Sequence, residues 1–283
     1  MMNRKFITVL AILLSLSFGA KSQNKQLKII SYNIFDSFRG DSVVKNLFVQ
    51  LIGKEKPDII ALQEVKGYSE QSLNDFAKSM DMPYSALQRE RGHSVALISK
   101  YPITNVKKVT KKVFHGYMYA DILDYHIVVA HLAPFTYTQR NVEMDSLLTF
   151  LSKLQDHKIL VMGDLNAMSP LDKGSYGSDK IALMQASEAK NAHIRNLNNG
   201  KIDYSAMQKI LDAGYLDTWR TLNKNFEKSA PTTIKKHNNY TRIDYILVNN
   251  TLKKQCLKAY MIKNELTEKI SDHYPQVLEI KIN

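Results

Sequence analysis

The chain has 283 residues, of which 44% are hydrophobic and 23% are charged, and its formal net charge is +12 at pH 7. A single cysteine, Cys256, excludes a fold held by internal disulfides, and the lack of repeats, low-complexity tracts and Pro/Gly/Ser-rich linkers excludes a repeat protein or a string of tethered modules. The sequence around Cys256 favours a buried strand residue over a nucleophile. The positive charge favours polyanionic partners such as nucleic acid, phosphoinositides or an acidic lipid surface, although the lysines are scattered along the chain.

The first 22 residues have the pattern of a cleavable signal peptide. A basic segment at residues 1–5 precedes a largely apolar stretch of 13 residues at 6–18, too short to span a bilayer. Ala20-Lys21-Ser22 fits the small-residue cleavage pattern, so we expect a mature chain of residues 23–283 in the periplasm or outside the cell, without a stable membrane anchor. Loss of the three basic residues of this segment lowers the net charge from +12 to +9. The length of the mature chain suits one large α/β domain.

Hydrophobic periodicity predicts the secondary structure along the mature chain. The first helix has apolar residues on one face, with Asp41 as its N-cap and Pro57 beyond its end. Short apolar runs predict buried strands, and a polar stretch without periodicity at 171–200 predicts a long loop, which in a compact domain is often functional. In chain order, the expected strands are 27–33, 58–64, 94–99, 118–123, 125–131, 159–164, 241–249, 255–263 and 275–282, and the expected helices are 41–54, 69–80, 140–155 and 204–213.

The balance of these elements indicates the architecture. Strands outnumber helices, and consecutive strands joined by short turns imply antiparallel pairing. Two mainly antiparallel sheets packed face to face, with the helices outside, would bury strands of this kind. The sequence therefore predicts an α/β sandwich.

The segment Gly163-Asp164-Leu165-Asn166 carries the most chemical information. It follows an apolar run, and Gly163 allows the backbone to come close to whatever lies at the strand end. Asp164 and Asn166 point the same way if the extended geometry continues. The carboxylate can take a proton from water, and the amide can donate hydrogen bonds to a phosphate oxygen. Alone, such a pattern is more typical of a turn.

Other polar residues also follow apolar runs, and their order along the chain is informative. The set is Asn33, Gln63-Glu64, His131, Gly163-Asp164-x-Asn166, Arg242-x-Asp244 and Ser271-Asp272-His273. In this order it resembles the endonuclease/exonuclease/phosphatase superfamily of deoxyribonuclease-I-like phosphohydrolases, from about residue 27 to the end. The resemblance implies a four-layer α/β sandwich, formed by a catalytic domain of residues 23–283, with the active site at the edge where strand ends and loops meet. It indicates the superfamily strongly and the substrate weakly.

The resemblance also implies a phosphate-ester hydrolase that uses a divalent metal. Mg²⁺ takes oxygen ligands, keeps several waters and is usually held by one or two carboxylates, with Mn²⁺ and Ca²⁺ as the alternatives. Glu64 is the principal predicted ligand, and Asn33 and Asp272 contribute. The cysteine and histidine pattern does not indicate a structural zinc site. Taken alone, Glu64 would instead be a capping or surface carboxylate.

The same resemblance implies catalytic roles for the remaining residues. Asp164 orients or deprotonates the attacking water, and Asn166 holds a phosphoryl oxygen as charge builds. His273 contacts the scissile phosphate. Asp244, 29 residues earlier, fixes the tautomer of His273, which predicts a hydrogen bond of roughly 2.6–3.2 Å between them. His131 stabilises the phosphate or protonates the leaving oxygen.

The leading hypothesis is an exported Mg²⁺-dependent phosphodiesterase that acts on nucleic acid, with no obligate protein partner. Arg140, at the start of a predicted helix, is a candidate for binding a substrate phosphate, and a solvated helix residue is an equal alternative. A second hypothesis is a lipid or inositol phosphate hydrolase of the same superfamily, for which Phe135–Tyr137 is a small candidate for a lipid-contacting segment. A third is a catalytically silent binding protein on the same scaffold, which predicts missing site residues, whereas the principal ones are all present.

Overall fold

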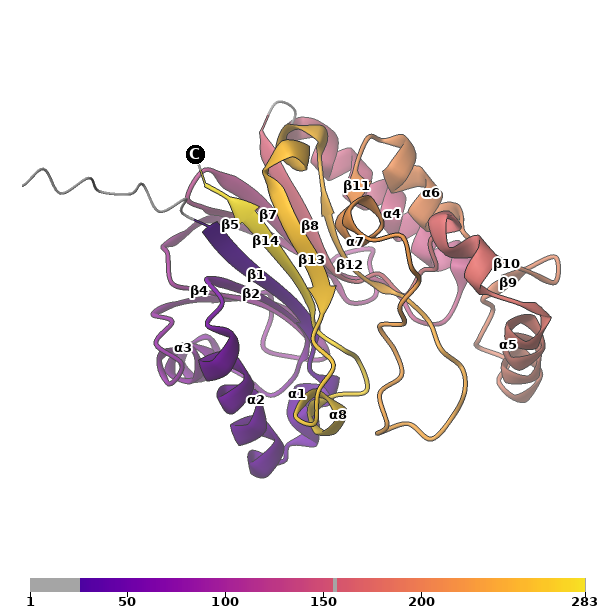
Figure 1. Cartoon of the computed structure of the whole chain (residues 1–283), viewed down its shortest axis with the longest axis horizontal. Coiled ribbons are helices and arrows are strands. Elements are labelled where there is room, and N and C mark those ends of the chain that lie inside the picture. Colours follow the sequence, from indigo (N-terminus) through magenta and orange to yellow (C-terminus); the bar gives the residue numbers. More distant parts are fainter. Residues whose placement is uncertain (1–25, 155–156, 283) are drawn as a thin grey trace, which may run out of the picture.

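Two six-stranded sheets stack at the centre of the molecule (Figure 1). They are seen in a computed structural model, which describes residues 26–154 and 157–282. The predicted signal peptide, residues 1–22, lies outside the described residues. Within the part of the chain that the structure describes, no helix combines the length and hydropathy needed to cross a membrane.

Each sheet has one parallel strand pair at its centre, β1 with β2 and β7 with β8, flanked by antiparallel pairs. The predicted sandwich of two mainly antiparallel sheets is therefore confirmed. The first sheet has the order β13 (Cys256–Met261), β14 (Gln276–Lys281), β1 (Gln26–Asn33), β2 (Ile59–Val65), β4 (Ser94–Ser99) and β3 (Tyr84–Leu87). The second has the order β11 (Leu216–Asp217), β12 (Asp244–Val248), β8 (Lys158–Asp164), β7 (Tyr125–His131), β6 (Gly116–Ile122) and β5 (Ile103–Val109). A separate small pair joins β9 (Leu197–Asn198) to β10 (Lys201–Ile202).

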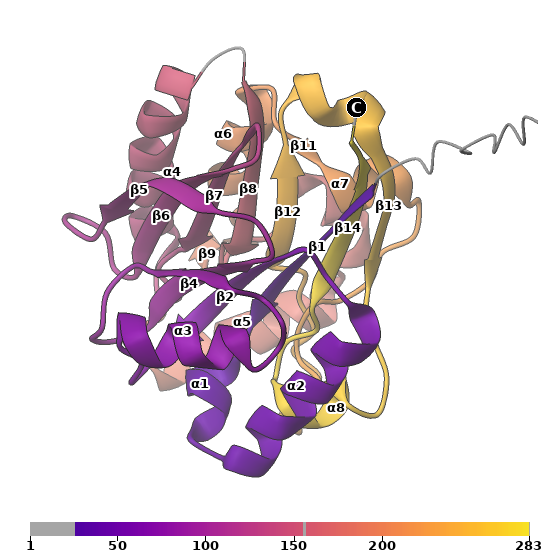
Figure 2. The ribbon, with the colours of Figure 1, turned by 90° about the vertical axis from the view of Figure 1, so that its left-hand side faces the viewer.

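Helices cover the outer faces of both sheets, which gives four layers. Figure 2 shows α2 and α3 outside the first sheet and α4 and α6 outside the second. The helices are α1 (Phe35–Arg39), α2 (Ser42–Glu55), α3 (Glu70–Lys78), α4 (Tyr137–Leu151), α5 (Ser178–Lys190), α6 (Ser205–Asp212), α7 (Thr218–Leu222) and α8 (Thr267–Ile270). Short 3₁₀ turns are η1 (Ser152–Leu154), η2 (Pro170–Ser175) and η3 (Asn250–Gln255). The predicted cap is present, because the Asp41 side chain accepts hydrogen bonds from the first turn of α2.

Three apolar layers hold the sandwich together. One lies between the sheets and includes Ile29, Ile127 and Leu160. A second packs α2 and α3 on the first sheet through side chains such as Phe48, and a third packs α4 and α6 on the second through side chains such as Leu147. Central strands are therefore covered on both faces, which explains why they appear in the sequence as continuous apolar runs rather than alternating ones.

The prediction of a long loop at 171–200 is wrong. The segment contains most of η2, all of α5 and the strand β9. Its helix escaped detection because α5 buries only Lys180 and Met184, so it has no apolar stripe. The edge strand β5 was also missed, because it has no fully buried residue. In both places the chain lies on the surface of the sandwich, where periodicity is weak.

Candidate active site

Four side chains reach one edge of the sandwich from the ends of the two parallel strand pairs. Asn33 ends β1 and Glu64 lies next to the end of β2, while His131 ends β7 and Asp164 ends β8. The carboxyl ends of parallel strands meet at the same edge of a sheet. Asn33 Nδ2 donates a hydrogen bond to Glu64 Oε1 (3.1 Å) within its own sheet and to Asp164 Oδ2 (3.1 Å) in the other sheet. One amide group thus joins the two sheets at the centre of the site.

The close backbone approach predicted at Gly163 is present beside Asp164. Gly163 has a φ of +143°, and a Cβ there would lie 1.8 Å from the Ala130 carbonyl oxygen of neighbouring β7. Asp164 is buried, and its Oδ1 accepts a hydrogen bond from the backbone nitrogen of Asn166 at 2.9 Å. Burial, followed by the nearby charge of Asp244, raises the pKa of Asp164 to about 7. A carboxylate with a pKa near neutrality is suited to accept a proton from water.

Asn166 turns the chain away from β8. Its φ of +48° lies in the left-handed region, which asparagine tolerates better than most residues. Its Nδ2 donates a hydrogen bond to the Leu132 carbonyl oxygen at 3.0 Å. Because the amide has two hydrogens, one remains for a phosphoryl oxygen, and the role inferred from the sequence stays a prediction.

His273 and Asp244 form the hydrogen bond predicted from the sequence, with 2.8 Å between His273 Nδ1 and Asp244 Oδ2. His273 Nε2 lies 3.8 Å from Asp164 Oδ2. Burial opposes the charged ring, but the Asp244 and Asp164 carboxylates outweigh it and raise the pKa of His273 well above its ordinary value. The loop is held by Ser271, whose Oγ donates to the Asn33 carbonyl oxygen at 2.6 Å and accepts from the His273 backbone nitrogen at 3.2 Å. The surroundings of His273 therefore hold its ring in place next to Asp164 and favour its charged form.

His131 and His273 differ in the direction in which their surroundings shift their pKa values. It is buried, its Nε2 lies 3.7 Å from Asp164 Oδ2, and its ring stacks on His115 with centroids 4.0 Å apart. Burial, followed by the influence of His115 and His273, lowers the pKa of His131 well below its ordinary value. A ring that stays neutral is a hydrogen-bonding group, whereas protonation of the leaving oxygen, one of the two roles implied by the sequence, suits a charged ring better.

Glu64 belongs to a half-buried group that the sequence did not reveal. Single ligand atoms of Asp36, Glu64 and His93 all lie within 4.8 Å of one another. Glu64 Oε2 accepts from the Asp36 backbone nitrogen at 2.8 Å, and Asp36 Oδ1 lies 2.6 Å from His93 Nε2. The segment 35–39 has φ between +44° and +64° at every residue, a strained left-handed turn that points the Asp36 backbone at Glu64. The sequence feature that could have revealed this group is Asp36, an acid three residues after Asn33.

The predicted metal-ligand set of Glu64, Asn33 and Asp272 is only partly brought together. Asn33 Oδ1 accepts from the Phe35 backbone nitrogen at 3.0 Å, so the side of its amide that faces Glu64 is the donor. Asp272 Oδ2 lies 3.8 Å from Lys235 Nζ, and its carboxylate forms no hydrogen bond with Asn33 or Glu64. Glu64 and Asp36 instead offer carboxylate oxygens close to one another in a half-buried position, a set that fits a divalent cation such as Mg²⁺.

Arg140 is buried, which rules out the solvated helix residue considered above. It is 4% exposed, donating from Nη1 to the Ala133 carbonyl oxygen (3.2 Å) and from Nη2 to Asn196 Oδ1 (2.7 Å). Burial lowers the pKa of its guanidinium to about 10. Arg140 lines a cavity beside His273, so its predicted contact with a substrate phosphate is sterically reasonable and stays a prediction.

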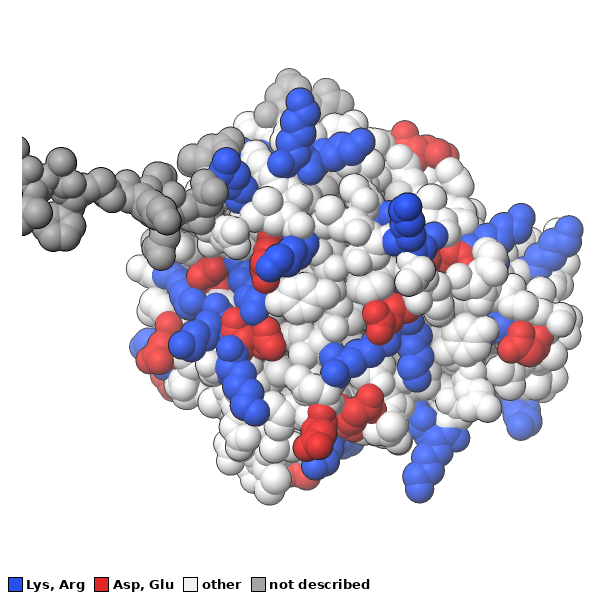
Figure 3. Space-filling model, viewed as in Figure 1, with Lys and Arg blue, Asp and Glu red and all other residues white. Residues whose placement is uncertain are grey.

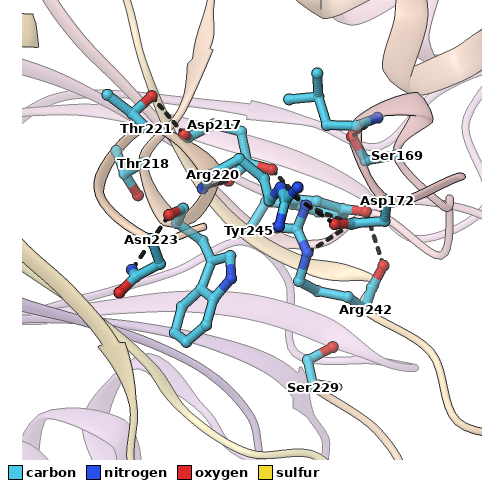
Figure 4. A network of polar contacts seen from close by, with 12 residues as sticks. Ser169, Asp172, Asp217, Thr218, Arg220, Thr221, Asn223, Ser229, Arg242 and Tyr245 are labelled. Atoms are coloured by element: carbon cyan, nitrogen blue, oxygen red, sulfur yellow. Dashed lines mark hydrogen bonds and ion pairs between the residues drawn. The ribbon is translucent and has the colours of Figure 1, made fainter. Parts of the chain in front are cut away.

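A buried ion network is centred on Arg242, two residues before Asp244, which begins β12 (Figure 4). Arg242 donates from Nε to Asp172 Oδ2 at 2.7 Å and from Nη2 to Asp217 Oδ2 at 2.6 Å. All three side chains are fully buried. The network ties η2 and the start of α7 to β12, and it therefore fixes the strand that carries Asp244.

Two stacked mixed sheets, with carboxylates, amides and imidazoles at their shared edge, define the class of deoxyribonuclease-I-like phosphoric ester hydrolases. The chain matches the sequence model of the Endonuclease/Exonuclease/phosphatase family over residues 30–273 and belongs to that family. It is therefore a metal-dependent phosphoric ester hydrolase, as predicted. A search of curated proteins found no match.

Solved structures share the fold at low sequence identity. An AP endonuclease from Archaeoglobus fulgidus is 21% identical with a TM-score of 0.70. A variant of the 3′ phosphatase NExo from Neisseria, bound to a product DNA hairpin, is 17% identical with a TM-score of 0.69. The 3′–5′ exonuclease NExo from Neisseria meningitidis is 16% identical with a TM-score of 0.68. Each match covers 90% of this chain and 100% of the other.

Proposed function

We propose that the protein is an exported Mg²⁺-dependent phosphodiesterase that cleaves nucleic acid. The observation that carries this proposal is the cluster in which Asp164, with a pKa raised to about 7, lies 3.8 Å from His273, whose ring is held by Asp244 and whose pKa is raised. A proton acceptor and a cation fixed side by side suit attack of water on a phosphate ester.

The side chains divide the chemistry between them. A divalent metal, when bound by Glu64 with Asp36, supplies charge neutralisation for the phosphate. Asp164 accepts the proton of the attacking water, and Asn33 keeps its carboxylate in place. His273 donates from Nε2 to a phosphoryl oxygen as negative charge builds there, a contact that strengthens in the transition state.

Nucleic acid is the substrate class that the comparisons support best. Two of the structural neighbours are named as nucleases and the third was captured with a DNA hairpin. A mature charge of +9 favours a polyanion. Figure 3 shows lysines and arginines spread over the face in view and interrupted by acidic groups, so on this face the basic side chains form no single broad band. Export follows from the predicted signal peptide.

One observation favours the lipid-hydrolase alternative. Phe114 and Phe135 are 43% and 41% exposed, and their rings meet edge to face at 5.2 Å. Both lie near the site, since Phe114 also packs on His115, which stacks on His131. An exposed aromatic pair could enter a lipid surface.

A substrate panel tests the proposal. Plasmid DNA, abasic duplex, RNA, sphingomyelin and inositol phosphates are each incubated with Mg²⁺ and with chelator. We expect Mg²⁺-dependent cleavage of a nucleic acid that exceeds cleavage of the other substrates. Preferential hydrolysis of sphingomyelin or of an inositol phosphate would reject the nuclease assignment and keep the enzyme class.

Glu64→Gln should raise the Mg²⁺ concentration needed for half-maximal cleavage. The substitution removes one negative charge from the proposed metal ligands while keeping the shape of the side chain. Because Mg²⁺ is held by only one or two carboxylates, its affinity depends strongly on each of them. Activity is measured across a Mg²⁺ titration, with Glu55→Gln, at a distant ion pair with Lys28, as the control. An unchanged Mg²⁺ response would remove Glu64 from the metal site.

Binding of inactive Asp164→Asn protein to duplex DNA should weaken as salt increases. Each phosphate contact releases counterions, so the logarithm of the affinity falls linearly with the logarithm of the salt concentration. Fluorescence anisotropy between about 50 and 200 mM salt gives the slope. A flat slope together with tight binding to neutral-headgroup vesicles would favour the lipid alternative.

A further inference from the structure

A cavity of about 250 Å³ adjoins the catalytic cluster, with His273 and Asn166 in its lining. Arg140 from α4 and Lys180 from α5 line it on another side. The loop between α7 and β12 contributes a further wall, and Figure 1 shows this loop at the same edge of the molecule as α5 and α8. The cavity is smaller than the roughly 300–1,000 Å³ typical of sites for whole small molecules. It therefore suits one compact group.

Two cations in this lining are buried without a carboxylate partner among the described residues. Lys180 is 0% exposed, and its Nζ donates to Asn239 Oδ1 and to the Tyr240 carbonyl oxygen (2.9 Å). Arg140, 4% exposed, donates only to the neutral oxygens of Ala133 and Asn196. An ammonium group has three hydrogens, so one donor of Lys180 is left. Both cations therefore retain capacity for an anion.

Burying these charges is costly, because a buried cation needs an opposite charge to replace its hydration. Burial lowers the pKa of Lys180 to about 8. Two acids also line the cavity: Asp272 faces Lys235 (3.8 Å), and Asp203, which accepts from the Ser205 backbone nitrogen (3.0 Å) and from Asn198 Nδ2 (3.2 Å), acts on Arg140 through its charge. Three basic side chains in this lining, Arg140, Lys180 and Lys235, therefore stand against two acids, which leaves an excess of positive charge next to the catalytic residues.

We infer that this cavity binds a terminal phosphate group of the substrate while the adjoining phosphodiester lies against Asp164 and His273. The inference rests on the proposed function and specifies its substrate as a nucleic-acid end that carries a phosphate monoester. A monoester bears a charge of about −1.5 to −2 at neutral pH and offers three acceptor oxygens. That charge matches Lys180 and Arg140, and a small cavity accommodates a chain end better than a phosphate with chain on both sides.

The first test measures phosphate binding without catalysis. Thermal stability is followed in chelator against increasing inorganic phosphate, because a ligand that binds only the folded state raises stability with its concentration. The wild type should be stabilised, and Lys180→Met should weaken the apparent affinity roughly 10- to 100-fold, the value of hydrogen bonds to a charged group. Lys173→Met, an exposed lysine outside the cavity, serves as the matched control. Equal stabilisation of wild type and Lys180→Met overturns the inference, since phosphate would then bind elsewhere.

The second test uses the Mg²⁺-loaded enzyme and single-stranded oligonucleotides. Their ends carry a 5′-phosphate, a 3′-phosphate, a methyl-capped phosphate or only hydroxyl groups. One phosphorylated end should raise kcat/KM at least roughly tenfold over the hydroxyl and methyl-capped ends, and Lys180→Met should bring that ratio towards one. Should Lys180→Met fail to fold, Lys235→Ala at the half-exposed side of the same cavity is used instead.

The outcomes of the two tests separate the inference from the proposed function. Equal rates for all ends in the wild type reject recognition of a terminal phosphate. Failure to cut any of the oligonucleotides, together with failure to cut plasmid DNA, abasic duplex and RNA in the substrate panel, rejects the nuclease proposal. The phosphate-binding test in chelator still decides whether the cavity is an anion site.

Discussion

His273→Ala should lower phosphodiester cleavage by about 10²–10⁴-fold, the typical contribution of positioned acid–base or electrostatic groups. Asp244→Asn should lose less, because the ring remains while its orientation and charge weaken. The double substitution should be little worse than His273→Ala, since groups that act as a unit are not additive. The basis is the 2.8 Å hydrogen bond between the two side chains. Purified variants are compared by kcat/KM at saturating Mg²⁺.

The comparison of the two single variants with the double variant is a double-mutant cycle, and one result would contradict the expectation. If the two losses multiply, His273 and Asp244 act independently and the hydrogen bond has no catalytic function. Thr149→Ala, on the exposed side of α4, is a control for the general effect of a small substitution, because the Thr149 hydroxyl, among the described residues, bonds only to the Asp145 carbonyl oxygen of its own helix.

The hydrogen bond between Asp244 and His273 should also affect the pH dependence of the activity. The Asp244 carboxylate helps to raise the pKa of His273, so its replacement by a neutral amide lowers the affinity of the ring for its proton. In Asp244→Asn, the loss of activity that follows deprotonation of His273 should therefore begin at lower pH than in the wild type. An unmoved profile would mean that Asp244 acts only through packing.

Arg242→Met should reduce the free energy of unfolding by about 3–5 kcal/mol, because it leaves the buried Asp217 carboxylate without its cation and the buried Asp172 carboxylate with only the partly exposed Arg220 nearby. Replacing both acids by asparagine in the same variant should restore much of the loss, since the unpaired charges cause it. Urea unfolding provides the measurement.

Arg220→Met is the matched control for this network. Arg220 is partly exposed and lies 3.5 Å from Asp172, so its loss should have an effect of about 1 kcal/mol or less. A similar loss in Arg220→Met and Arg242→Met would show that the buried network does not carry the stability assigned to it.

Much of the sandwich was predictable from the sequence, because both faces of its central strands are covered. That burial requires continuous apolar side chains, and runs such as 94–99 and 125–131 coincide with β4 and β7. Strand ends at the buried edge carry polar groups, so Asp164 and His131 could be found from their position after those runs. The hydrogen bond between Asp244 and His273 followed from the family resemblance, and the structure confirms its distance.

The surface elements and the charges of the site were decided by the tertiary structure. Helix α5 has no apolar stripe, so no local pattern revealed it or the burial of Lys180. Asp36 joins Glu64 only because a left-handed turn folds back over the end of β2. The opposite pKa shifts of His131 and His273 depend on which groups surround each ring. The sequence by itself therefore determined the strands and which polar residues end them, since these depend on local burial. Only the tertiary structure determined the charge of each group and the cavity beside them, since both depend on neighbours distant in the chain.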